Sequence, residues 1–153
     1  MICCLLALSL CSHSSCYSKR ELANQNLKIN DETFSVLIQD SNINVTEEKA
    51  IVIDNQEKLL AFYAVLNATR YPDFEVPLVN FKNQSVIVVA MGQKSSGGYS
   101  LPTPKFVKSE NLFKFYYIMP KPLEPVTMSI TTPGIVVLVN LPGDKVTIQV
   151  NDK

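Results

Sequence analysis

The stretch that decides the fold is Val86–Met91, which reads VIVVAM and contains no polar residue. A short run that is rich in β-branched residues and apolar at every position is typical of a strand covered on both faces. Ile135–Val139 (IVVLV) has the same character. We therefore expect two central strands, each with other parts of the chain packed on both of its sides.

Residues before this stretch predict two strands and one helix. Phe34, Val36 and Ile38 alternate with Ser35, Leu37 and Gln39, and Lys49–Ile53 is a short apolar run. A helix should follow, with Asp54 as its N-cap and Glu57 as the capping-box partner. Its apolar face has the spacing i, i+3, i+4, i+7 and consists of Leu59, Phe62, Tyr63 and Leu66. Pro72–Phe81 should then be an extended loop.

Residues after the decisive stretch read almost entirely as strands. One predicted strand places four side chains on one face, namely Phe113, Phe115, Tyr117 and Met119. Pro120–Pro125 carries three prolines and should be a rigid loop or edge. Val146, Ile148 and Val150 alternate with polar residues in a last strand. Leu141–Asp144 has the residues of a type II turn, so it predicts a C-terminal hairpin.

These elements predict a mainly β fold, a β-sandwich or open-barrel-like arrangement of antiparallel sheets, with one amphipathic α-helix. Such a fold could also be classed as α+β. The length of 153 residues suits one domain, which we place at residues 31–153.

Composition excludes several kinds of chemistry. The last cysteine is Cys16 and the only histidine is His13, so residues 17–153 lack both residue types. A Ser-His-Asp triad, a cysteine nucleophile, a zinc site and a disulfide framework are therefore excluded there. The net charge is zero, which argues against nucleic-acid binding. We expect no enzyme activity, no metal and no cofactor; the acidic pairs Asp73/Glu75 and Glu47/Glu48 are typical of solvated surface.

The first residues resemble an export leader. Ile2–Cys11 is an apolar run too short to span a membrane but of the length found in signal peptides. Residues 1–16 are therefore expected to be a signal peptide or lipoprotein leader with acylation at Cys16, or alternatively at Cys11. Plain secretion also remains open. Residues 17–30 are polar and should be a flexible tether. The expected location is a bacterial cell envelope, lipid-anchored in the outer membrane or in the periplasm, or else secreted.

Three of the five glycines lie between Gly92 and Gly98. The spacing matches a phosphate-binding loop, but Gly98 and Tyr99 stand where lysine and Ser/Thr are needed, so no nucleotide is expected. Adjacent glycines before a tyrosine could form a binding loop or a tight turn with the tyrosine packed on the core. The candidate binding-loop residues are Gly92, Ser95, Ser96, Gly97, Gly98 and Tyr99.

Three short motifs in order carry a family resemblance. Gly97-Gly98-Tyr99-Ser100 is preceded by Val79-Asn80-Phe81 and followed by Thr131-Thr132-Pro133. Taken together they resemble the C-terminal domain family of the protease complex subunit PrcB, over about residues 77–151. Ser95 and Ser96 stand where this family usually has Pro and Thr.

The resemblance implies a β-rich domain on a small envelope protein that is often lipid-anchored. The family takes its name from an accessory subunit that associates with a surface protease. It therefore implies a protein partner, an envelope or secreted protease being suspected. Two alternatives stay open: a protease inhibitor that uses the Gly97-Gly98-Tyr99 loop, or an envelope domain that binds carbohydrate or another ligand.

Overall fold

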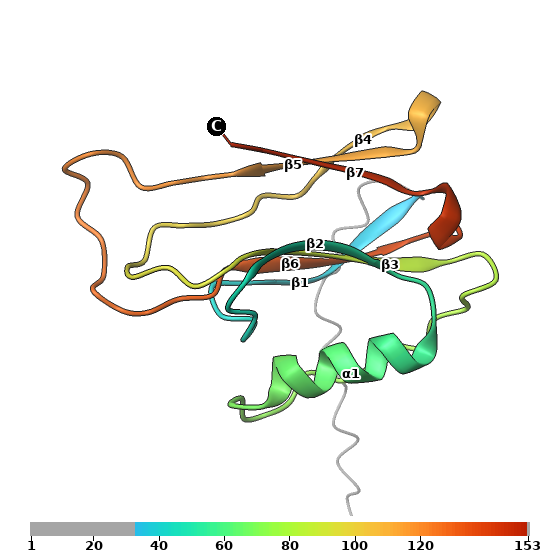
Figure 1. The fold of residues 1–153 in the computed structure, drawn as a ribbon, viewed down its shortest axis with the longest axis horizontal. Coiled ribbons are helices and arrows are strands. Elements are labelled where there is room, and N and C mark those ends of the chain that lie inside the picture. The colour runs from blue at the N-terminus through green and yellow to red at the C-terminus, as the bar shows by residue number, and fades with distance from the viewer. Residues whose placement is uncertain (1–32, 153) are drawn as a thin grey trace, which may run out of the picture.

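The structure is a computed structural model that describes residues 33–152, without the side chain of Asp152. It has three layers, with helix α1 below a four-stranded sheet and a three-stranded sheet above (Figure 1). The strand order is β1-β6-β3-β2 in the first sheet and β4-β5-β7 in the second. The elements are β1 (Phe34–Asp40), β2 (Glu48–Ile53), α1 (Gln56–Asn67), β3 (Ser85–Met91), β4 (Lys105–Val107), β5 (Leu112–Tyr117), β6 (Gly134–Val139) and β7 (Thr147–Asp152).

The middle layer depends on β3 and β6, as the sequence predicts. All seven residues of β3 are buried. Alternate residues such as Val86 and Val88 pack with α1, whereas Ile87 and Val89 pack with the three-stranded sheet. β3 pairs with β2 and β6, so both of its edges are also occupied. The mainly β fold class with one α-helix in the described residues is confirmed.

Helix α1 buries the predicted apolar face, but its N-cap differs from the prediction. Leu59, Tyr63 and Leu66 are buried. The N-cap is Asn55, whose extended backbone lets its side-chain oxygen accept the N–H of Lys58 at 2.9 Å. Asp54 instead accepts a hydrogen bond from the Lys58 ammonium at 2.8 Å, and this bond holds the pKa of Asp54 below its ordinary value.

The predicted C-terminal hairpin is wrong. β7 does not pair with β6 but lies parallel to β5 in the other sheet. The reason is that β1 and β3 already occupy the two edges of β6, so no hydrogen-bonding edge is left for β7. The predicted type II turn is also wrong, because Gly143 does not have positive φ; residues Gly143–Lys145 form a 3₁₀ turn that carries the chain between the layers.

Smaller differences concern the upper sheet and the termini. The short strand β4 is not predicted by the sequence pattern, and Met119 lies exposed beyond the end of β5. The leader 1–16, with Cys11 and Cys16, and the tether 17–30 lie outside the described residues. Within residues 33–152, no helix is both long enough and apolar enough to cross a bilayer.

Replacing Tyr63 with Phe should make stability less sensitive to alkaline pH. Burial raises the pKa of Tyr63 from 10.0 to about 12, because the phenolate would lose its hydration. The stability that the protonated Tyr63 side chain contributes is therefore complete at pH values below the pKa of tyrosine in the unfolded chain. This stability is lost as the pH rises through the pKa of Tyr63 in the folded protein. Between about pH 8 and pH 11, urea unfolding should show the wild type losing about 1 kcal/mol more than Tyr63→Phe. Equal losses in the two proteins would contradict this account.

Candidate functional site

Three loops meet at one end of the four-stranded sheet. At this end β1 finishes at Asp40, which pairs with Gly134, and β3 finishes at Met91, which pairs with Glu48. We call it the distal end. The loop after β3 and the long segment between β5 and β6 both extend beyond the strands here, toward the left of Figure 1. The candidate binding loop predicted from the sequence therefore lies at the distal end.

Gly92 begins this loop and is fixed against strand β2. It is buried and has a φ of 72°, a left-handed conformation that favours glycine. A Cβ atom on Gly92 would lie only 2.8 Å from the backbone nitrogen of Glu48. The next residue, Gln93, donates its N–H to the carbonyl of Thr46 at 2.9 Å. Gly92 thus allows close backbone packing.

The middle of the loop is joined to the β5–β6 segment by backbone hydrogen bonds. Lys94 and Thr131 exchange two such bonds, of 2.8 and 3.0 Å. The Thr131 hydroxyl donates to the carbonyl of Ser96 at 3.0 Å, and Gly97 donates its N–H to the carbonyl of Thr127 at 2.9 Å. The candidate binding loop is therefore bonded to the segment that ends in the Thr131-Thr132-Pro133 motif.

Gly97 and Gly98 leave room for the same segment to pack against the loop. A Cβ atom on Gly97 would overlap the Thr127 hydroxyl. Gly98 has a φ of 87°, and a Cβ atom there would lie 3.0 Å from both Pro120 and Val126. Both positions thus need glycine because the two loops lie too close for a side chain, and Gly98 needs it also for its backbone conformation.

The Tyr99 side chain packs against the core more than it extends into solvent. Its ring is half-buried and contacts the hydrophobic cluster between the two sheets. The Lys94 ammonium lies 5.6 Å from the centre of the ring, within cation–π range. Of the other candidate residues, Ser95 and Gly98 are exposed and Ser96 is half-buried. The structure therefore brings the candidate residues together, with much of the tyrosine surface packed against the core.

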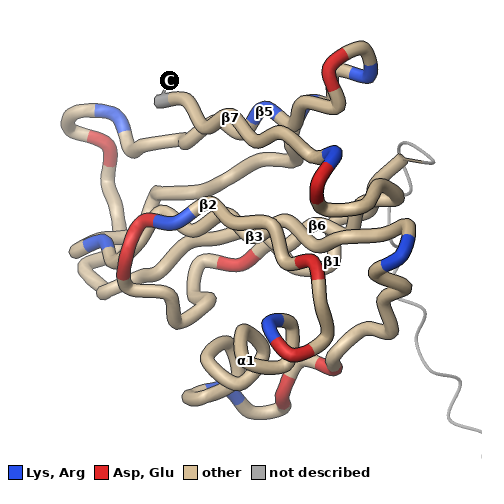
Figure 2. The backbone as a smooth tube through the Cα atoms, turned by 45° about the vertical axis from the view of Figure 1, so that its right-hand side comes forward, with Lys and Arg blue, Asp and Glu red and all other residues tan. Residues whose placement is uncertain are grey.

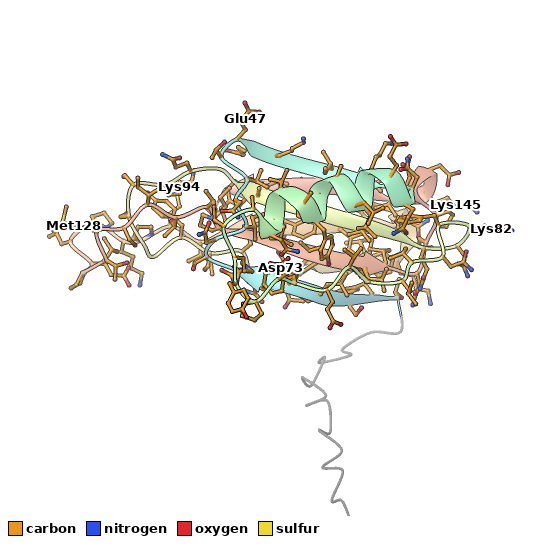
Figure 3. All side chains as sticks on the ribbon, turned by 90° about the horizontal axis from the view of Figure 1, so that it is seen from below. Glu47, Asp73, Lys82, Lys94, Met128 and Lys145 are labelled. Carbon is orange, nitrogen blue, oxygen red and sulfur yellow. The ribbon has the colours of Figure 1, made fainter. Side chains whose placement is uncertain are left out.

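The segment that the loop holds exposes a group of apolar side chains that the sequence reading did not single out. All ten residues from Lys121 to Ile130 are exposed. Leu123 and Met128 are almost fully exposed, and Ile130 is 70% exposed. We call Leu123, Met128 and Ile130 the apolar tip; Figure 3 shows Met128 at the extreme end of the molecule. A signal was present in the sequence, because apolar residues within a proline-rich loop have no strand in which to be buried.

Leu123 is presented by a tight turn. Glu124 donates its N–H to the carbonyl of Lys121 at 3.0 Å, and the Glu124 carboxylate accepts the N–H of Lys121 at 2.8 Å. Pro122 and then Leu123 occupy the two central positions, and Leu123 has a φ of 68°. Positive φ at the second central position is typical of a type II turn, where glycine is preferred. A leucine in this conformation costs free energy that a glycine would not.

The acidic side chains of the described residues do not form a cluster. No group of three or more His, Cys, Asp or Glu side chains within residues 33–152 is placed to hold a metal ion. The Glu48 carboxylate accepts a hydrogen bond from the Tyr117 hydroxyl at 3.1 Å. Glu47 lies at the β2 edge and Asp73 on the other side of α1, so the two acidic pairs are not brought together (Figure 3). Positive and negative residues are interspersed along the described chain (Figure 2).

The fold and the distal end define a β-rich domain in which a Gly-Gly-Tyr loop supports a proline-rich apolar loop. Residues 85–140 match the family model described as PrcB C-terminal. The match runs from β3 to just after β6, so it includes the candidate loop and the apolar tip but not Val79–Phe81. The resemblance inferred from the sequence is confirmed over this segment. Searches of curated proteins and of solved structures gave no significant match.

Replacing Gly98 with Ala should loosen the β5–β6 segment without unfolding the core. The added Cβ atom would meet Pro120 and Val126 in a backbone conformation that alanine disfavours. We expect hydrogen exchange at the amides of Gly97 and Thr131 to become about tenfold faster, because local opening costs less free energy. Ser95→Ala, at an exposed position of the same loop, is the control and should leave both amides unchanged. Unchanged exchange in Gly98→Ala would show that the glycine does not hold the segment.

Proposed function

We propose that this protein is a non-enzymatic accessory protein, exported or lipid-anchored in a bacterial envelope, that binds a partner protein through the apolar tip. The partner suspected from the family resemblance is a surface or secreted protease. Support for this role comes from the PrcB C-terminal match over residues 85–140 and from the exposed apolar residues at the distal end.

The observation that carries the proposal is that the apolar tip is exposed to solvent while hydrogen bonds fix the backbone around it. Exposed hydrophobic residues that gather on one surface often mark an interaction site. Leu123 is fixed by the Lys121–Glu124 turn, and the neighbouring Thr127 is fixed by its bond to Gly97. A fixed loop loses less conformational entropy on binding than a flexible one. The tip thus has the properties of a preorganised contact for a hydrophobic pocket on another protein.

The structure favours Leu123 and Met128 over Tyr99 as the main contact. The Tyr99 ring is half-buried against the core, whereas Leu123 and Met128 are almost completely exposed. In this proposal the Gly97-Gly98-Tyr99 loop positions the segment that binds. A protease inhibitor built on the same end of the molecule remains an alternative, and a panel of purified proteases tests it by stoichiometric inhibition.

Removing the Leu123 and Met128 side chains from the apolar tip should strongly reduce partner capture. We would use the wild type and Leu123→Gly/Met128→Ser as baits on the native envelope fraction, with crosslinking and mass spectrometry. Glycine suits the positive φ at position 123, so the first substitution should relieve strain while it removes the side chain. We expect at least a tenfold loss of the partner captured by the wild type, because exposed apolar anchors carry much of the binding free energy of an interface.

Leu78→Ser is the matched control, since Leu78 is as exposed as Met128 but lies in the loop before β3. It should capture the partner as the wild type does. Capture by the tip variant at the wild-type level would refute binding through the tip. A wild-type bait that captures no envelope protein would refute the accessory role itself.

A further inference from the structure

Strand β2 has an open edge in the described part of the chain. It is the last strand of its sheet and pairs only with β3. Met91 donates its N–H to the carbonyl of Pro133, which lies on the β6 side of β3. The direction of backbone bonding alternates along an antiparallel strand, so the odd-numbered residues of β3 bond to β6 and the even-numbered residues bond to β2. Their partners are the odd-numbered residues Lys49, Ile51 and Ile53. The N–H and C=O groups of Glu48, Ala50 and Val52 therefore point away from the sheet.

A groove runs along the open edge. Its volume is about 420 Å³, and it lies between β2 and the side of α1 that carries Phe62 and Val65. Val45, Glu47, Lys49 and Ile51 line it along the chain that leads into and through β2. The far half of β2 is not available, because the 3₁₀ turn at Gly143 packs against Val52. The accessible edge is thus centred near Glu48.

The side chains along this edge are self-complementary. Val45, Glu47, Lys49 and Ile51 occur at every second position and line the same groove. If a second copy of the edge is turned by 180° about an axis through Glu48, Glu47 faces Lys49 across the two strands. The regular edge does not continue to Val45, because β2 begins at Glu48 and the Thr46 carbonyl is bonded to Gln93 of the same chain. Opposite charges directly across two antiparallel strands are stabilising. Neither Glu47 nor Lys49 belongs to the two ion pairs of the described residues, Lys58–Asp54 and Arg70–Asp40.

We propose that the β2 edge and its groove bind a second copy of this chain, as an isologous dimer with antiparallel β2 strands. The two four-stranded sheets would then continue through the axis, with Glu47 of each copy opposite Lys49 of the other. Such a contact is closed and symmetric, as in most homodimers. The two Glu48 side chains meet at the axis on the opposite face of the sheet, where each carboxylate accepts the Tyr117 hydroxyl. This pair of like charges opposes the contact, so the two Glu47–Lys49 pairs must outweigh it.

A second copy carries the complementary side chains in the orientation that an antiparallel pairing of two β2 edges requires.

Charge reversal and restoration test the dimer. Sedimentation equilibrium of the purified full-length chain, at concentrations up to about 100 µM, should show a reversible dimer. Lys49→Glu and Glu47→Lys should each weaken it at least tenfold, since like charges then lie opposite each other. The double variant Glu47→Lys/Lys49→Glu should regain the dimer, and so should an equimolar mixture of the two single variants.

Two controls separate this interface from general effects of charge and fold. Lys82→Glu makes the same change of charge at an exposed lysine away from β2 and should dimerise as the wild type does (Figure 3). Val65→Lys fills the groove and should prevent dimerisation, whereas Leu60→Lys alters a similarly exposed position of α1 outside the groove and should not.

Several results would overturn the proposal: a wild type that stays monomeric, a Lys49→Glu variant that dimerises normally, or a double variant that fails to recover. A monomeric wild type whose partner capture is lost in Lys49→Glu would instead assign the groove to an extended segment of the partner. Loss of partner capture in the tip variant does not depend on these outcomes. The experiments can therefore refute the partner contact at the apolar tip and the dimer contact at β2 independently of each other.

Discussion

The burial of β3 and β6 on both faces is the constraint on which the rest of the structure depends. Each apolar side chain that is fully buried contributes about 1.5–3 kcal/mol relative to exposure, and these two strands supply four of the ten buried residues in the cluster beside α1 and six of the ten in the cluster between the sheets. One layer cannot cover both faces, so the protein needs α1 on one side and a second sheet on the other. The burial of β3 and β6 on both faces therefore leads to a fold of three layers.

The same constraint determines where hydrogen-bonding edges remain. β6 lies between β1 and β3, so the last strand must cross to the upper layer and pair with β5. The Gly143 turn that makes this crossing packs on Val52 and leaves only the first half of β2 open. Backbone groups at an open edge readily pair with another strand. The groove beside α1 and the proposed dimer contact thus arise from the way the core is covered.

The glycine motif has a structural role that its composition alone does not reveal. Gly92 lets the loop pack on β2, and Gly97 and Gly98 let it approach the β5–β6 segment. The bonds from Lys94 and Ser96 to Thr131 join the candidate loop to the Thr131-Thr132-Pro133 motif, which lies more than thirty residues further along the chain. The apolar tip is held by these contacts. In this view the loop supports the binding surface, and the residues that contact a partner lie on the segment it holds.

The sequence by itself determined the elements that local patterns control: the apolar runs at Val86–Met91 and Ile135–Val139, the buried face of α1, and the loop nature of Pro120–Pro125. It also carried the family resemblance and the candidate loop, because glycines and short motifs are visible without a fold. Tertiary structure alone decided the pairing of β7 with β5, since strand pairing depends on which edges are already occupied. It also decided that Leu123 and Met128 stay exposed and that Glu47 and Lys49 line an open groove, because exposure depends on what packs nearby and not on the residue itself.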